Sequence, residues 1–251
     1  MFRIIAFITS LVIILLGMFF ILLNILDIDE DYRLFLPIAP LNTIFISAVA
    51  LLVTVIAARN YTATALPEML GLGGAVLAFG TGILIYSWFT RVALEMRFAV
   101  YDGTFLLAGV IHLLGAAILK EKSGLSEKQR RMITLLCYSV ICLIIMLGSW
   151  QLFSILSPFT VPRGILKGIG AVLYFAAAIV CVLKYRSSRR VFYFWYSLGL
   201  MVFAMGILFM AQGALESRIG WLGRIAQYVG GAYFIAAVLA ARRPAGKPVV
   251  K

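Results

Sequence analysis

Long apolar runs separated by short polar segments follow one another along the whole chain. Eight of these runs have the roughly 20-residue length that an α-helix needs to cross a hydrocarbon core of about 30 Å. Several of the polar segments contain proline, which interrupts helices. The pattern predicts an all-α protein, a polytopic bundle of about eight transmembrane helices. The predicted spans lie near residues 3–26, 39–58, 69–90, 101–120, 131–153, 164–184, 191–212 and 220–241.

The composition supports this interpretation. Hydrophobic residues make up 63% of the chain and the mean hydropathy is +1.05, whereas soluble domains are about 45–50% apolar. The run at 3–26 is too long for the apolar part of a signal peptide, and no small-residue cleavage pattern follows it. We therefore interpret it as the first span. Residues 1–241 are predicted to form one transmembrane domain, and residues 242–251 a basic cytoplasmic tail or linker stub.

Charged residues are divided unequally between the two sets of connecting segments. If the amino terminus is cytoplasmic, 15 of the 22 basic residues but only 3 of the 10 acidic residues fall on the inner side. Cytoplasmic loops of membrane proteins carry an excess of Lys and Arg. We therefore predict a multi-pass protein of the cell membrane with both termini cytoplasmic. Orientation and contact with lipid headgroups explain the net charge of +12, and we expect no nucleic-acid partner.

The sequence offers few residues for catalysis. It has no Gly-rich phosphate loop, HExxH or GxSxG motif, so we expect no enzymatic activity in this chain. The cysteines Cys137, Cys142 and Cys181 form no CxxC pair, and no metal site is predicted. The single histidine, His112, lies in the middle of a span. We favour an imidazole that is hydrogen-bonded to a neighbouring helix over haem with this residue as its sole axial ligand, and no other cofactor is indicated.

Polar side chains inside the predicted spans gather in one layer, in the outer half of the bundle. Burying such groups in hydrocarbon is costly, so they are candidates for a functional site. Pairing is expected, for example of Asp102 with Arg224 or Lys167, and an unpaired cation could receive a small anionic ligand or a lipid headgroup. The alternative is that the long side chains extend to the headgroups. The predicted ligand-binding residues are Asp102, His112, Gln151, Arg163, Lys167, Arg224 and Gln227.

The span at 220–241 combines small residues with polar ones. Ala226, Gly230 and Ala232 allow another helix to approach closely, while Arg224 and Gln227 offer hydrogen bonds. A helix that faces lipid needs neither property. We therefore expect this span to pack in the interior of the bundle.

Three short stretches spread over most of the chain from residue 65 onward. They are residues 65–73 (ALPEMLGLG), residues 195–200 (WYSLGL) and residues 221–231 (WLGRIAQYVGG). Together with the Pro162–Arg163 start of the sixth span, they resemble the N-terminal multi-helix membrane modules of bacterial and archaeal sensor histidine kinases, the membrane-associated sensor type. The resemblance implies a two-component system in which the last span leads into a cytoplasmic PAS or kinase region beyond residue 251. It supplies no ligand-binding motif.

These observations favour a sensory input module, in which a ligand, lipid or membrane-state signal shifts helix packing and the last span passes the change to the cytoplasm. The expected partners are the lipid bilayer and either a second copy of the chain or a cytoplasmic signalling domain. Two alternatives stay open. One is a small-solute transporter or channel, although we find no internal repeat and few polar groups at the midplane. The other is a membrane-embedded lipid-modifying enzyme, which needs an acid–base pair at interfacial depth.

Overall fold

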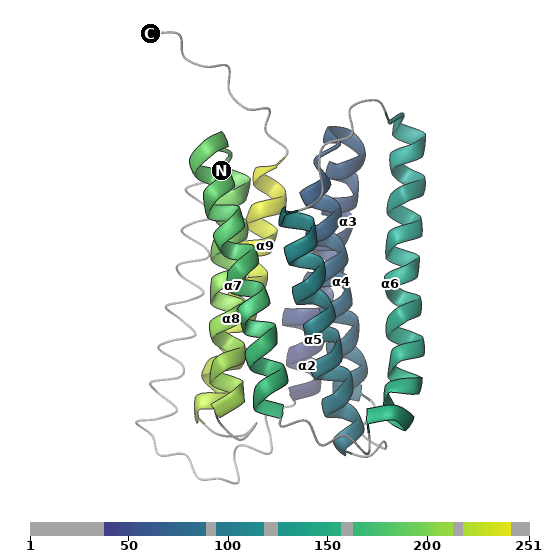
Figure 1. Cartoon of the computed structure of the whole chain (residues 1–251), viewed down its shortest axis with the longest axis vertical. Coiled ribbons are helices and arrows are strands. Elements are labelled where there is room, and N and C mark those ends of the chain that lie inside the picture. Colours follow the sequence, from purple (N-terminus) through teal and green to yellow (C-terminus); the bar gives the residue numbers. More distant parts are fainter. Residues whose placement is uncertain (1–37, 89–93, 118–124, 157–162, 213–217, 242–251) are drawn as a thin grey trace.

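The computed structural model describes residues 38–88, 94–117, 125–156, 163–212 and 218–241. All regular elements in these residues are helices (Figure 1). Seven helices are long and apolar enough to cross a membrane. The described residues thus confirm an all-helical bundle with the character of a multi-pass membrane protein. The predicted first span, 3–26, and the tail, 242–251, lie outside the described residues, so the count of eight spans and the position of both termini stay predictions.

The long helices alternate in direction along the chain. The first is a continuous rod in which the π-helical segment η2 joins α2 to α3. We call the end of the bundle at the bottom of Figure 1, where α4, α6 and α8 end and α5, α7 and α9 begin, the lower end, and the opposite end the upper end. The elements are α2 (Ile38–Asn42), η2 (Thr43–Ala48), α3 (Val49–Thr64), α4 (Pro67–Trp88), α5 (Leu94–Ala117), α6 (Glu127–Leu156), α7 (Arg163–Ser188), α8 (Val191–Gln212) and α9 (Arg218–Ala240).

Two helix boundaries differ clearly from the predicted spans. The helix predicted to end near residue 58 continues to Thr64 and stops where Ala65 adopts a left-handed conformation with φ of 58°. The helix predicted to begin near residue 101 begins at Leu94. Both differences arise because a helix continues through polar residues as long as its backbone hydrogen bonds are made, whereas hydropathy marks only the apolar part. Asp102 therefore lies about two turns inside α5 and not at its first residue.

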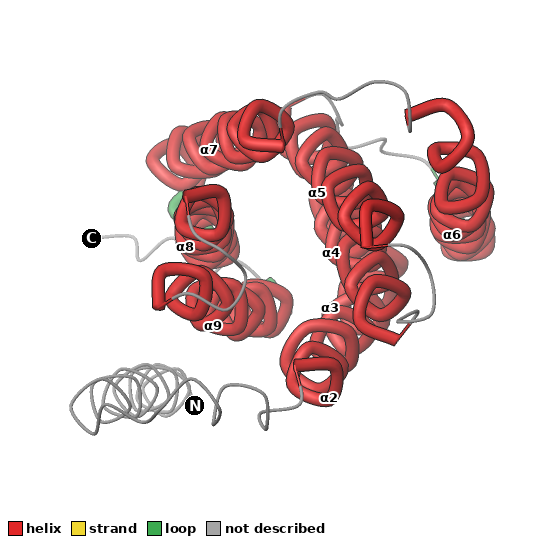
Figure 2. The backbone as a smooth tube through the Cα atoms, turned by 90° about the horizontal axis from the view of Figure 1, so that it is seen from below, coloured by secondary structure: helices red, strands yellow, loops and turns green. Residues whose placement is uncertain are grey.

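Six of the rods form a closed ring, and α6 lies outside it (Figure 2). The order around the ring is α3, α4, α5, α7, α8 and α9, and α9 returns to α3. At this closing contact the Asn60 Nδ2 donates a hydrogen bond to the carbonyl oxygen of Val238 at 2.6 Å. The outer helix α6 packs on α3, α4 and α5, and most of its described apolar side chains, up to residue 148, are exposed. That exposure suits a helix that faces lipid.

Glycines bring the backbones of α8 and α9 into contact. Gly206 and Gly199 of α8 lie against Gly223 and Gly230 of α9, respectively. A Cβ atom added to Gly206 would lie 2.6 Å from the carbonyl oxygen of Gly223, which is closer than real Cβ atoms approach. Small residues at these positions therefore permit the close packing that the sequence of the last span predicts.

Candidate functional site

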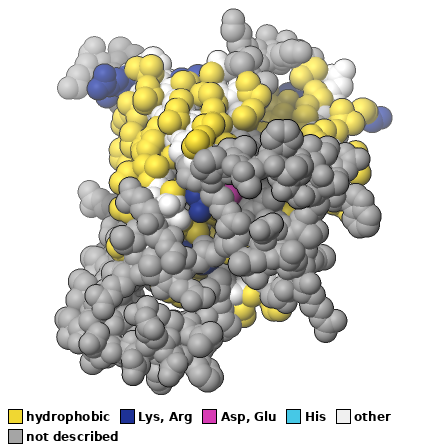
Figure 3. Space-filling view, turned by 60° about the horizontal axis from the view of Figure 1, so that its bottom comes forward, with side chains coloured by type: hydrophobic (Ala, Val, Ile, Leu, Met, Phe, Trp, Pro, Cys, Tyr) yellow, Lys and Arg dark blue, Asp and Glu magenta, His cyan; other side chains and the backbone are white. Residues whose placement is uncertain are grey.

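A group of polar side chains converges at the lower end, between α5, α7, α8 and α9. Asp102, Lys167, Arg224 and Gln227 are all buried there. Figure 3, in which the lower end comes forward, shows basic side chains beside an acidic one among apolar side chains. These four side chains are buried within the bundle, with 9% or less of each residue exposed. We call them, together with the residues that hydrogen-bond among them, the lower cluster.

Met210 and Tyr101 connect the helices of the lower cluster. The Lys167 Nζ donates a hydrogen bond to the carbonyl oxygen of Met210 at 3.3 Å. The Tyr101 hydroxyl donates to the Met210 Sδ at 3.5 Å and accepts a hydrogen bond from the Gln227 Nε2 at 2.9 Å. Met210 of α8 thus contacts the side chains of Tyr101 in α5 and Lys167 in α7. Gln227 of α9 is connected to this group through its hydrogen bond to Tyr101. Asp102, the neighbour of this tyrosine, and Lys167 each make further interactions.

A second string of hydrogen bonds reaches the lower cluster from α2 and α4. The Tyr228 hydroxyl donates to the Asn42 Oδ1 at 3.0 Å, and the Asn42 Nδ2 donates to the Ser87 Oγ at 3.1 Å. Tyr228 follows Arg224 by one turn of α9, so the string ends near the guanidinium. Our sequence analysis missed Asn42 and Ser87, because nothing in their local sequence distinguishes them from other isolated polar residues.

Arg224 is a charged residue of the lower cluster with a buried side-chain atom that makes no hydrogen bond. It is only 3% exposed, and its Nε has no hydrogen-bond partner among the described residues. It forms no ion pair with a described carboxylate, so the expected pairing of Arg224 with Asp102 is not made. Asp102 is engaged in other interactions instead. The described contacts of the charge are with the Tyr228 side chain and with the Trp221 ring, whose centre lies 5.7 Å from the guanidinium carbon in a cation–π contact.

Two of the predicted ligand-binding residues are not placed. Gln151 lies in α6 and Arg163 opens α7, but the side chains of both lie outside the described residues. The lower cluster is therefore built from α5, α7, α8 and α9 with the contribution of α2 and α4.

His112 lies near the middle of α5 and points into the ring. Its Nδ1 is 2.8 Å from the hydroxyl of Tyr196 on α8. The Tyr174 ring meets the imidazole edge-on at 5.0 Å, and the Phe234 ring stacks on it at 5.5 Å. The predicted hydrogen bond to a neighbouring helix is confirmed. Haem does not fit here, because rings pack against the imidazole and the adjoining cavity is far smaller than the several hundred Å³ of a cofactor pocket.

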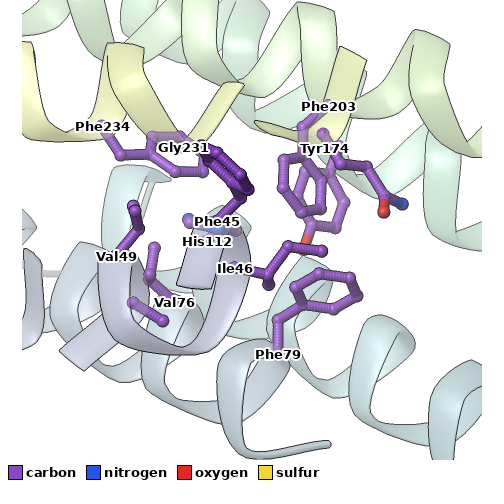
Figure 4. A pocket seen from close by; sticks show the side chains of 12 residues that line it. Phe45, Ile46, Val49, Val76, Phe79, His112, Tyr174, Phe203, Gly231 and Phe234 are labelled. Atoms are coloured by element: carbon purple, nitrogen blue, oxygen red, sulfur yellow. The ribbon is translucent and has the colours of Figure 1, made fainter. Parts of the chain in front are cut away.

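A small cavity lies between His112 and Gln227. The space open to the centre of a water-sized sphere is about 20 Å³, which suffices for about one water molecule. Figure 4 shows aromatic side chains on one side of the cavity and Val49 and Val76 on the other. The polar residues at its wall are His112, Tyr174 and Gln227. The cavity separates the lower cluster from the His112–Tyr196 pair.

A second polar group, the upper cluster, consists of Glu68, Lys184 and Tyr193. The Lys184 Nζ of α7 lies 2.7 Å from the Glu68 Oε1 of α4, and the Tyr193 hydroxyl of α8 donates to the same oxygen at 2.8 Å. The partners are 116 and 125 residues from the carboxylate in sequence. Our sequence analysis did not predict this group, because no local spacing connects Glu68 to either partner.

No group of three His, Cys, Asp or Glu side chains in the described parts of the chain is arranged to hold a metal ion. A scan against protein-family models, a search of curated proteins and a search of solved structures found no match to this chain. The resemblance to sensor-kinase membrane modules thus receives no support from these comparisons. The arrangement of the side chains is the basis for a functional assignment.

Proposed function

We propose that this chain is a membrane-embedded sensory input module. A signal received by the lower cluster changes the packing of α9, and α9 carries the change to the upper end. The observation that carries the proposal is the path of α9 itself. This helix bears Arg224 and Gln227 at the lower end, and at the upper end it meets α3 through the hydrogen bond between Val238 and Asn60.

The contact between α8 and α9 supports transmission along the bundle. Their backbones touch at Gly206 and Gly223, and the Met210 and Phe203 side chains of α8 also pack against glycines of α9. Because close packing transmits displacement, a movement of α9 is expected to move α8. Since α8 carries Tyr193, the same pair of helices reaches both the lower cluster and Glu68 of the upper cluster. A ligand can shift this packing only by as much as its affinities for the two arrangements differ.

We propose further that the upper end faces the cytoplasm. Exposed and half-buried basic side chains gather there, whereas the described basic side chains of the lower end, Lys167 and Arg224, are buried. An excess of Lys and Arg is typical of the cytoplasmic side. With 3–26 as an additional span, both termini are cytoplasmic, and the receiver is a cytoplasmic signalling domain or a second copy of the chain. The basic residues of the upper end are Arg59, Lys128, Arg130, Arg131, Lys184, Arg186, Arg189 and Arg190.

Coupling between the two ends can be tested with spin labels. Labels at Leu239→Cys in α9 and Arg186→Cys in α7, with the three native cysteines replaced, report the position of α9 at the upper end. We expect Arg224→Gln, at the lower end, to change the distance distribution measured by double electron–electron resonance. The control Leu222→Ala changes an exposed side chain at the same depth of the same helix and should leave the distribution unchanged. Identical distributions in all three proteins would contradict the proposed function.

A further inference from the structure

We propose that the lower cluster binds a phosphate group, with Arg224 as its principal ligand. The inference rests on the proposed function, since it identifies the lower cluster as the site of input, and it adds the chemical class of the signal. The starting observation is a cation that is buried within the membrane-spanning part of the bundle and lacks a described carboxylate partner.

The unused edge of the Arg224 guanidinium fits an oxyanion. A guanidinium presents its N–H groups as a planar fork, and the edge formed by the Nε and one terminal nitrogen matches two oxygens of a phosphate or carboxylate. The Nε of Arg224 is buried and has no hydrogen-bond partner among the described residues, so its N–H is a donor that a bound oxygen would satisfy once the side chains that cover it move apart. An unpaired charge in such a place is costly, and a bound anion removes the cost.

The surroundings of Arg224 add positive charge. The Lys167 Nζ bonds to the carbonyl of Met210, and Met210 itself packs against Gly223, the residue before the arginine. Asp102 is the one acidic residue among the buried charged residues of the lower cluster that the structure describes. Among the described side chains of the lower cluster, two cations and one carboxylate favour a ligand of low negative charge, such as a phosphodiester or inorganic phosphate, over a polyanion.

The depth of the site indicates where the phosphate comes from. Trp221, whose ring lies beside the guanidinium, is of the residue type that marks the level of the lipid headgroups. Phosphate is the abundant oxyanion at this level, and it is supplied either by a phospholipid headgroup or by the adjoining water.

Binding can be measured on the full chain purified in phosphate-free dodecyl maltoside. One arm adds inorganic phosphate at constant ionic strength, and the other adds short-chain phosphatidylglycerol. Because Trp221 contacts Arg224, a fluorescence change that is lost in Trp221→Phe reports binding at this site, and a shift in melting temperature provides a second readout. We expect a saturable response in at least one arm and an affinity at least tenfold weaker in Arg224→Gln. Arg224→Lys keeps the charge but lacks the planar fork, so its affinity should lie between those of the native chain and Arg224→Gln. The control Leu222→Ala should bind as tightly as the native chain does.

A response to phosphate alone would assign a soluble anion, and a response to the phospholipid alone would assign a headgroup; both support the inference. No saturable response in either arm, or equal affinity in Arg224→Gln and the native chain, would overturn it. This assay is independent of the spin-label distances. Phosphate binding without a change at the upper end would contradict only the proposed function, and a change at the upper end without phosphate binding would contradict only the assignment of the ligand.

Discussion

Glu68 in the upper cluster and Arg224 in the lower cluster are both charged and almost completely buried, but their surroundings differ. The Glu68 carboxylate receives a lysine and a tyrosine on one oxygen, and the Lys184 side chain is 30% exposed and so reaches the surface. Arg224 is 3% exposed and has neutral or aromatic neighbours among its described contacts. A buried charge that is paired with its counterion can join helices. A buried charge without a counterion destabilises the fold and therefore marks a candidate functional site. This difference is consistent with our proposals, in which the upper cluster serves assembly and the lower cluster serves binding.

The largest expected effect comes from breaking the upper pair. Glu68→Leu leaves Lys184 without its carboxylate and should lower the free energy of unfolding by about 2–3 kcal/mol. The value lies at or below the low end for a broken buried pair because Lys184 can reach water. The measurement is unfolding in mixed micelles of dodecyl maltoside and SDS, followed by circular dichroism. As a control, Glu127→Gln removes a pair whose side chains are 60% and 69% exposed, and should change stability by less than about 0.5 kcal/mol. Equal losses in both variants would remove the distinction between the clusters.

The contact that joins the two clusters can be tested with a pair of glycine substitutions. Gly206→Ala places a methyl group against the backbone of α9 and should destabilise the bundle by about 2 kcal/mol. Gly168→Ala, where nothing lies within 4 Å of the added Cβ, should be neutral or slightly stabilising because alanine favours helix. The same unfolding assay separates them. If the two substitutions behaved alike, the α8–α9 contact would not be as close as the structure shows.

Replacing Arg224 should change the free energy of unfolding in the opposite direction from breaking the Glu68–Lys184 pair. Arg224→Met removes a buried charge that has no described counterion, so in phosphate-free detergent we expect the variant to be as stable as the native chain or more stable, by up to about 1 kcal/mol. Phosphate at ten times its Kd should then raise the stability of the native chain alone by about 1.4 kcal/mol. A large loss of stability in the variant without phosphate would show that the described protein already neutralises Arg224.

The smallest change in stability is expected from the hydrogen bond between His112 and Tyr196, a pair that lies between the two clusters along the bundle. A double-mutant cycle with His112→Phe and Tyr196→Phe should give a coupling free energy of about 0.6 kcal/mol, which is the average for side-chain hydrogen bonds within membranes. Neither substitution should alter phosphate affinity, because this pair lies beyond the cavity from Arg224. A coupling energy near 2 kcal/mol, or a loss of phosphate affinity, would mean that the imidazole belongs to the lower cluster.

Seven of the predicted helices could be found from the sequence because the bilayer fixes their length. Hydropathy reports the depth of a residue along the membrane normal, and depth alone brought Asp102, Lys167, Arg224 and Gln227 into one predicted layer. The structure agrees that these residues are buried at one end. The interior packing of the last span was also foreseeable, because its small and polar residues have no use against lipid.

What the sequence could not supply is the rotation of each helix and the order of the helices around the ring. Both are set by contacts between residues far apart in the chain, such as Glu68 with Tyr193 or His112 with Tyr196. The mean apolar character of the helices does not distinguish α6, which faces outward, from α4, which is mostly buried. A single amide such as Asn42 has no local pattern at all, and only its neighbours in space reveal that it belongs to the lower cluster.

The closure of the ring by α3 and α9 also sets an order of assembly in time. Membrane proteins are inserted as they are synthesised, amino-terminal part first. The hydrogen bond between Asn60 and Val238 joins residues that are 178 positions apart, so it waits until almost the entire described chain has been made. Until then Tyr101 lacks the helix that supplies Gln227, and its hydroxyl has to be satisfied by water or by other partners. The last helix to arrive thus completes the polar core, and until it arrives the nascent bundle stays open along the seam between its first and last described helices.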